Sequence, residues 1–346
     1  MLKQSLSYIS STAIIIVVNF FTLPYFTIYL SLADYGVLAL FLLFGNITTN
    51  FCSLALQQAS YRFYFKYNIE KFKVINFSIF IFILFCFFMT GFFVIFPFAD
   101  EISEIIFNNE ISGYLLKLAF ISGCFQYYYL YFINILTAQG RANYVSFILV
   151  FHAINIAVLT YYFINWHDLT DLAPIYANFI AFIISFVFSF LLNVSLFKIR
   201  LDFQHLYKSM KFAFPEIPSM AIGAIYSSFD KSLLSNYGGS TSIGNYEFGG
   251  RFASILKHFM DALSKSWGPF FMNNAEENSL SGKKRIVDTY YSLLFLFGFI
   301  GLVISFFSEE ALILLTTEEF YKAKYLIPIF IIKKKITEKK SEKLKK

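Results

Sequence analysis

The stretch that decides how this chain folds runs from Phe212 to Arg251 and reads FAFPEIPSMAIGAIYSSFDKSLLSNYGGSTSIGNYEFGGR. Two long apolar runs are separated here by a glycine-rich break, with Asp230-Lys231 in the first run and Arg251 in the second. A charged residue near the centre of a bilayer costs about 2.5–3.5 kcal/mol, so it usually faces a water-filled path or a binding site. If the helix begins at Phe212, however, Asp230 comes close to the head groups on the far side, since each residue adds about 1.5 Å. A cavity position and a head-group position both remain open for this pair.

The composition of the chain excludes a soluble globular protein. Of its 346 residues, 58% are hydrophobic and only 14% are charged, against about 25% charged in an ordinary soluble domain. The net charge of +6 arises in the last fourteen residues, Lys333 to Lys346, which hold eight Lys and two Glu. The basic balance is therefore a property of the tail and gives no argument for binding nucleic acid.

Continuous apolar runs indicate an all-α polytopic membrane protein with about nine to ten transmembrane helices. Nine runs are long enough to cross a bilayer, whereas the tenth stops after about ten residues where about twenty are needed. The runs cover residues 8–30, 36–59, 72–98, 112–136, 144–165, 172–197, 212–237, 243–263 and 289–307, with the incomplete tenth at 323–332.

A weak internal repeat divides these runs into two halves. Asp34-Tyr35-Gly36 leads into the second run and Gly244-Asn245-Tyr246 leads into the eighth, an offset of about six helices. An even offset predicts parallel repeats about an axis along the membrane normal. We therefore expect a six-helix bundle over residues 1–210, an incomplete second bundle over 211–332 and a lysine-rich tail over 333–346. The short tenth run and the abrupt change to lysine predict a form truncated at its C-terminus.

The charge of the connections alternates in sign along the chain. Because basic connections stay on the cytoplasmic side, this alternation predicts a cytoplasmic N-terminus. The connections expected inside carry Arg62, Lys66, Lys71, Lys73, Arg141, Lys198, Arg200, Lys208, Lys211, Lys265, Lys283, Lys284 and Arg285. Those expected outside carry Asp100, Glu101, Glu104, Glu110, Asp168, Asp171, Glu309, Glu310, Glu318 and Glu319.

Residue patterns typical of catalysis or metal binding are missing from the sequence. The four histidines are scattered without partner spacing, and no phosphate-binding loop is present. The three cysteines, Cys52, Cys86 and Cys124, fall inside apolar runs and are interpreted as small buried hydrophobes. His152, also in an apolar run, is interpreted as a packed or hydrogen-bonded histidine. We expect no catalytic residue, no metal and no cofactor, so the chain is not predicted to be an enzyme.

The order of several short motifs resembles the polysaccharide flippases. These are the Wzx-type branch of the multidrug/oligosaccharidyl-lipid/polysaccharide exporter superfamily, which transport O-antigen and other lipid-linked oligosaccharides. Each motif is loose, but their order and spacing extend over about Leu2 to Ile332. The motifs are Leu32-Ala33-Asp34-Tyr35-Gly36, Leu54 to Arg62 (LALQQASYR), Ala138-Gln139-Gly140-Arg141, Pro215-Glu216-Ile217-Pro218, Asp230-Lys231 and Gly244-Asn245-Tyr246.

The resemblance implies two six-helix bundles around a central cavity that opens alternately to either side of the bacterial inner membrane. The implied substrate is an undecaprenyl-pyrophosphate-linked oligosaccharide destined for lipopolysaccharide or capsule. Implied partners are membrane lipids, a polysaccharide polymerase and glycosyltransferases, and coupling to H⁺ or Na⁺ is left open. A multidrug-type small-solute exporter and a membrane-embedded glycan polymerase or glycosyltransferase remain as alternatives.

Five residues are candidates for a substrate cavity: Asn19, Arg62, Asp230, Lys231 and Arg251. Basic groups facing a membrane cavity suit an anionic substrate such as a lipid pyrophosphate or an acidic sugar. The hypothesis is that Arg62 and Arg251 hold the anionic head while Asp230-Lys231 pairs across the cavity. For Arg62, as for Lys117, snorkelling to the head groups is the competing interpretation.

Overall fold

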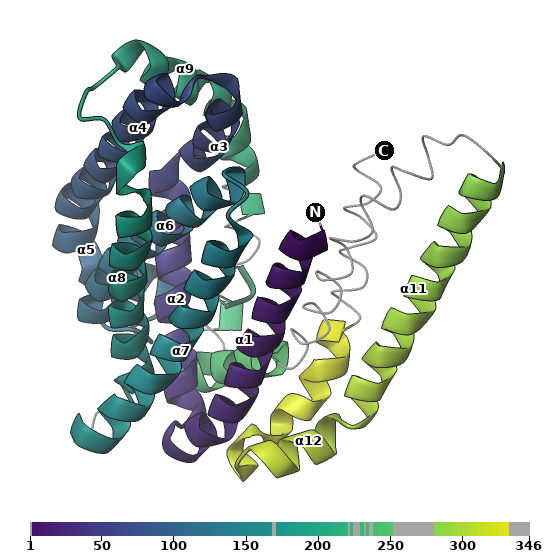
Figure 1. Cartoon of the computed structure of the whole chain (residues 1–346). Coiled ribbons are helices and arrows are strands. Elements are labelled where there is room, and N and C mark those ends of the chain that lie inside the picture. Colours follow the sequence, from purple (N-terminus) through teal and green to yellow (C-terminus); the bar gives the residue numbers. More distant parts are fainter. Residues whose placement is uncertain are drawn as a thin grey trace. The chain divides into compact units, whose positions relative to one another are not determined.

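The structure is a computed structural model that describes residues 2–167, 171–220, 222–223, 229–231, 233–234, 238–251 and 280–331 (Figure 1). The regular elements of this part of the chain are all helical, and six of its helices are long and apolar enough to cross a membrane. The prediction of an all-α, multi-pass membrane protein is therefore confirmed.

Residue contacts divide the chain into two compact units. We call Ala33–Ile243 the central unit, and Met1–Leu32 together with Gly244–Lys346 the terminal unit. These units do not follow the predicted halves, because the first helix belongs with the C-terminal segment. The predicted division into bundles at residues 210 and 211 stays a prediction.

Contacts in the terminal unit join the end of the first helix to the segment that follows the ninth apolar run. Thr317 donates its hydroxyl to the carbonyl oxygen of Thr27 at 3.1 Å, and Glu319 accepts from the backbone N–H of Leu32 at 3.4 Å. The described helices here are α1 (Leu2–Tyr29), α11 (Leu280–Phe306), α12 (Ser308–Leu315) and the 3-10 helix η4 (Glu318–Tyr325), with further helical residues at 244–251 and 326–331.

The glycine pair at 249 and 250 lies where two helices of the terminal unit approach closely. A Cβ atom on Gly249 would lie 3.1 Å from Cβ of Leu326, so a side chain there would crowd the neighbouring helix. Phe248 packs beside this contact, with its ring centroid 4.6 Å from that of Phe320. Small residues permit this approach of two backbones within a membrane.

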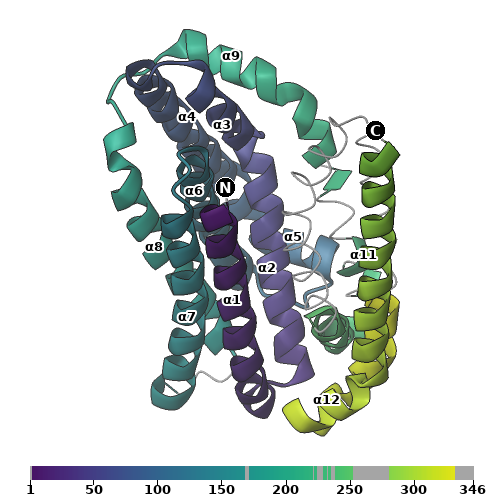
Figure 2. The same ribbon diagram turned by 45° about the vertical axis from the view of Figure 1, so that its right-hand side comes forward.

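The central unit contains most of the long helices (Figures 1 and 2). Its main elements are α2 (Leu32–Ser53), α3 (Leu56–Lys66), α4 (Ile69–Thr90), the π-helix η1 (Gly91–Ile95), α5 (Phe96–Phe107), α6 (Gly113–Ala138), α7 (Ala142–His167), α8 (Ala173–Asn193) and α9 (Phe203–Ala213). Two short 3-10 helices, η2 (Val194–Leu196) and η3 (Phe214–Glu216), follow α8 and α9.

The second apolar run does not continue to residue 59 as predicted. Leu54 and Ala55 have φ angles of +47° and +56°, in the left-handed region that side chains disfavour. This backbone turn ends α2 at Ser53, and α3 begins anew at Leu56. Arg62 therefore belongs to a separate short helix and does not close a membrane-spanning one.

The third run is longer than predicted, because α4, η1 and α5 form one continuous helical stretch of 39 residues, Ile69–Phe107. Acidic residues expected in a connection, including Asp100 and Glu104, lie on this stretch. It ends where Asn108 and Asn109 adopt left-handed φ angles of +50° and +62°. Asparagine tolerates that region better than most residues, which explains the stop.

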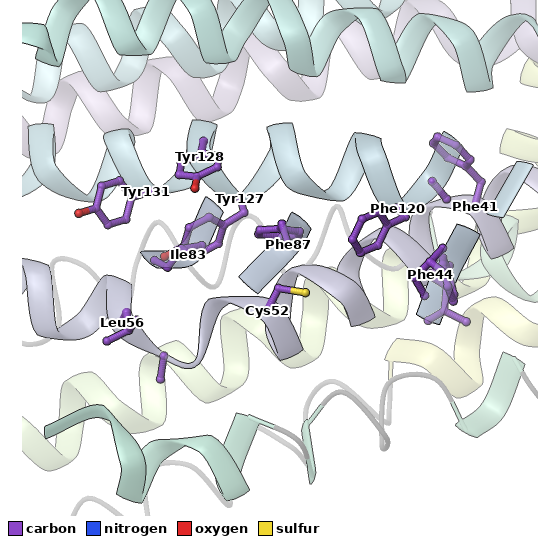
Figure 3. Close-up of a cluster of buried hydrophobic side chains, with 14 of the residues drawn as sticks. Phe41, Phe44, Cys52, Leu56, Ile83, Phe87, Phe120, Tyr127, Tyr128 and Tyr131 are labelled. Atoms are coloured by element: carbon purple, nitrogen blue, oxygen red, sulfur yellow. The ribbon is translucent and has the colours of Figure 1, made fainter. Parts of the chain in front are cut away.

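The hydrophobic core of the central unit is centred on α6, whose aromatic residues pack between α2, α4 and α8. Figure 3 shows part of this cluster, in which the rings of Phe87 and Phe120 lie 5.8 Å apart. Helices α2 and α6 approach closely at Gly45 and Gly123, where the Thr49 hydroxyl donates to the Gly123 carbonyl oxygen at 2.9 Å. All three cysteines are free; Cys52 is buried, as the sequence predicts, whereas Cys86 and Cys124 are only partly buried.

Large parts of the seventh and eighth predicted runs lie outside the described residues, as does the tail from residue 332. The predictions for those segments are not tested by the structure.

Candidate functional site

Arg62 is the candidate residue with the clearest surroundings. It lies on α3, which packs against α6 and α9. Its guanidinium carbon lies 4.4 Å from the ring centroid of Phe212, the geometry of a cation–π contact. The ring of Phe212 also meets that of buried Phe63, at 6.2 Å between centroids. The side chain of Arg62 is exposed and makes no ion pair within the described part of the chain, so its charge remains available to a ligand.

A buried polar network holds the base of α3 to α4 and α6. Asn76 is fully buried, and its side-chain oxygen lies 3.1 Å from the Ser60 hydroxyl and 2.5 Å from the Tyr131 hydroxyl. Its amide nitrogen donates to the carbonyl oxygen of Leu196 at 3.2 Å. Asn76 on α4 thus satisfies polar groups from three other elements at once. The sequence analysis did not single out these residues, because each alone is an ordinary polar residue near the end of a run.

One end of the central unit, which we call the basic end, comprises residues 54–73, 197–202 and α9. Figure 1 shows α3, the start of α4 and α9 gathered there. Glu70 accepts from Lys73 at 2.9 Å and from Lys198 at 3.2 Å, which joins two predicted inner connections. The backbone N–H of Asp202 donates to the Ser78 hydroxyl oxygen at 2.8 Å. Connections predicted to share a side of the membrane therefore meet in space.

The N-terminus of α9 is capped by Asp202, whose carboxylate accepts from the backbone N–H of His205 at 3.0 Å. The same carboxylate lies 2.8 Å from Nδ1 of the His205 ring. The backbone hydrogen bond, with help from the ring, holds the pKa of Asp202 below its ordinary value. An ionised Asp202 therefore stabilises the first turn of α9.

The opposite end, which we call the acidic end, comprises residues 99–114 and 238–240. Glu110 accepts a hydrogen bond from the backbone N–H of Ser240 at 2.8 Å. Gly239 has a φ of +63°, which suits glycine at this turn. Gly36 must also be glycine, because a Cβ atom there would lie 1.9 Å from the carbonyl oxygen of Ser240. The Asp34-Tyr35-Gly36 motif thus serves a close backbone approach.

The remaining candidates are placed, but they are not all brought together. Asp230 and Lys231 are half-buried helical residues of the central unit. Arg251 is a half-buried helical residue of the terminal unit, where Asn19 lies exposed on α1. Arg251 and Arg62 belong to different units, and the proposed pairing of Asp230-Lys231 across a cavity stays a prediction.

His152 is hydrogen-bonded and packed, as its place in an apolar run predicts. Its Nδ1 lies 3.0 Å from the Ser185 hydroxyl, and its ring lies near those of Tyr129 and Phe182, at 4.9 and 4.7 Å. Among the described residues, no group of three or more His, Cys, Asp or Glu is arranged to hold a metal ion.

Comparison of the sequence with known protein families gives a match. Residues 1–274 match the family described as "Polysaccharide biosynthesis protein". The chain belongs to this family. The match extends over the whole central unit and therefore includes both the basic and the acidic end. No curated protein sequence matches the chain.

Solved structures similar to this member of the polysaccharide biosynthesis family are membrane transporters. An inward-facing multidrug resistance MATE transporter of the MOP superfamily superposes with a TM-score of 0.66 at 12% identity, over 92% of this chain and 76% of that one. A point mutant of the Vibrio cholerae MATE transporter VcmN gives a TM-score of 0.48 at 16% identity, over 95% of this chain and 76% of that one. The first of these likenesses confirms the predicted fold class.

Proposed function

We propose that this protein moves an undecaprenyl-pyrophosphate-linked oligosaccharide across the bacterial inner membrane during surface polysaccharide synthesis. The observation that carries the proposal is the family match over residues 1–274, in a chain with the fold of a membrane transporter. The family indicates a polysaccharide pathway, and the fold suits alternating access in preference to chemistry. A Wzx-type flippase combines both features.

The orientation that we propose places the basic end in the cytoplasm and the acidic end outside. Its support is the segregation of charge within the central unit, where Lys73, Lys198 and α9 lie at one end and Glu110 at the other. Positive charge near the ends of membrane helices stays on the cytoplasmic side. The N-terminus is then cytoplasmic.

In this proposal Arg62 and Arg251 hold the anionic pyrophosphate head. The exposed guanidinium of Arg62, set on the Phe212 ring, has the planar donor geometry that suits phosphate oxygens. Asp230, Lys231 and Asn19 complete the polar lining. A small-solute exporter is the competing function, and it should be insensitive to loss of these cations.

The test uses the purified protein in vesicles that contain a fluorescent lipid-pyrophosphate oligosaccharide. Exposure of the fluorophore to a reductant outside the vesicles measures translocation. We expect Arg251→Ala and Arg62→Ala to slow it by at least about tenfold, equivalent to about 1.4 kcal/mol. Lys117→Ala is the matched control, because this half-buried lysine of α6 is expected to snorkel.

Equal translocation by all variants would remove the two arginines from the substrate site. Absence of lipid translocation, combined with export of a cationic dye, would replace the proposed function with multidrug export. Retention of translocation in Arg251→Lys would indicate that charge alone is recognised at that position.

A further inference from the structure

Helix α9 presents three distinct stripes of side chains. Successive residues of a helix point about 100° apart, so positions spaced by three or four lie on one face. One stripe packs onto the protein and is buried; it consists of His205, Leu206, Ser209 and Ala213. Figure 2 shows α9 lying across the end of the central unit, above α3 and α4.

The second stripe is apolar yet exposed. Phe203 and Tyr207 are 72% and 68% exposed, and Met210 continues the row at the spacing of helical turns. Phe214, the first residue of η3, extends the row and is 70% exposed. The neighbouring Ile199 is 90% exposed. Exposing several large apolar side chains in a row to water is unfavourable. The stripe therefore indicates that this face of α9 lies in an apolar environment.

The third stripe is polar and basic, and it borders the aromatic one. Gln204, Lys208 and Lys211 follow the same spacing one residue later along the chain, and all three are exposed. Neither lysine makes an ion pair within the described residues, in contrast to Lys73 and Lys198, which both pair with Glu70. The two lysines therefore present uncompensated positive charge.

We propose that α9 is a lipid-binding helix that lies in the membrane surface and recognises the phosphate groups of anionic phospholipids. The aromatic stripe enters the acyl-chain boundary, while Lys208 and Lys211 contact the phosphates beside it. A helix with basic residues flanking an aromatic face has the pattern of an interfacial anchor. The buried stripe fixes this anchor to α3 and α4, so lipid binding stabilises the basic end as a whole.

The charge pattern favours lipid over a protein partner as the occupant. Anionic lipids of the cytoplasmic leaflet attract basic segments next to membrane helices. Trp and Tyr are enriched at this depth, and Tyr207 stands at the centre of the stripe. The inference goes beyond the proposed transport, because these lipids are not the transported substrate.

The first measurement is the unfolding temperature of the full-length protein in detergent with added phosphatidylglycerol or phosphatidylcholine. We expect phosphatidylglycerol to raise it more, and Lys208→Gln with Lys211→Gln to abolish that difference. Lys73→Gln with Lys198→Gln removes the same formal charge from the same end and should preserve it. An equal effect of the two lipids, or equal losses in both double variants, would overturn the proposal.

The second measurement locates the helix in vesicles of phosphatidylglycerol and phosphatidylcholine. Spin labels attached at Tyr207→Cys and Gln204→Cys should differ, with the first more accessible to oxygen and the second to a water-soluble nickel complex. Equal exposure of both labels to the nickel complex would contradict membrane insertion. Dipolar coupling between labels on two molecules would instead assign the stripe to a second copy of the chain.

Discussion

The two ends of the central unit are stabilised by different kinds of contact. At the basic end, long side chains cover a short helix: Arg62 lies on Phe212, and Glu70 joins Lys73 to Lys198. At the acidic end the backbone makes the contacts, because Glu110 accepts the N–H of Ser240 and Gly36 admits its carbonyl oxygen. Contacts between side chains therefore stabilise the basic end, and contacts of the backbone close the acidic end.

The largest expected effect concerns which end faces the cytoplasm. Reporter fusions at Asn109 and Gln204 should give opposite and all-or-none results, with Gln204 cytoplasmic, because basic connections are retained inside. Alkaline phosphatase and fluorescent-protein activities of paired fusions provide the measurement. The same side for both positions would contradict the assignment of the two ends.

The second-largest effect is expected when the buried hydrogen-bond network near the basic end is removed. Asn76→Leu removes the donor to the Leu196 carbonyl oxygen and the acceptor of the Tyr131 hydroxyl, which keeps only its 3.1 Å contact with Ser60, at about 1–3 kcal/mol for each lost hydrogen bond. We therefore expect a loss of several kcal/mol in the free energy of unfolding, measured in micelles. Asn46→Leu is the control, since exposed Asn46 bonds Gln126, at 3.0 Å. Equal losses for the two variants would show that burial of the network contributes nothing.

A methyl group added at Gly36 should disturb the acidic end, with a smaller loss of stability than Asn76→Leu causes. Gly36→Ala would place Cβ 1.9 Å from the Ser240 carbonyl oxygen, so the turn must move at a cost of about 1–3 kcal/mol. A disulfide between Glu110→Cys and Ser240→Cys should then form much more slowly. In Gly223→Ala the added methyl meets no atom within 4 Å, so the rate should stay unchanged. An unaltered rate of disulfide formation in Gly36→Ala would mean that the turn at residues 238–240 does not pack against α2.

The smallest effect is the pH dependence of α9. Since the folded pKa of Asp202 lies below the unfolded one, its contribution to stability is present above the ordinary value of about 3.9 and is lost as pH falls through the folded value. Amide exchange of residues 203–213 should therefore accelerate below about pH 4, after correction for intrinsic rates.

Asp202→Asn should remove this acid sensitivity, because asparagine can cap a helix without ionising. Glu104→Gln, at an exposed site of the opposite end, should leave it unchanged. Identical pH profiles for wild type and Asp202→Asn would assign the sensitivity to another group.

Much of the fold follows from the sequence, since helix formation in a bilayer depends on local composition. The runs at 112–136 and 144–165 became α6 and α7 within a few residues of the predicted ends. The break at Leu54 and Ala55 could not be predicted, because neither residue favours a left-handed φ and only packing imposes it.

The candidate site was less accessible to prediction, because its contacts join distant segments. The sequence marked Arg62 by its charge but gave no reason to pair it with Phe212, which was assigned to the other half. Glu110 and Ser240 are 130 residues apart. The buried Asn76 network carries no charge signal at all, and only its hydrogen bonding across several helices distinguishes it.

The continuous helix from Ile69 to Phe107 has a consequence for how the protein fits different membranes. At about 1.5 Å per residue its 39 residues extend about 58 Å, against a hydrocarbon layer of about 30 Å. The π-helix at Gly91–Ile95 and the non-helical angles at Phe98 interrupt it beyond its midpoint. At such irregularities a helix can change direction, which relieves hydrophobic mismatch. We therefore expect thicker membranes to straighten the helix at this joint.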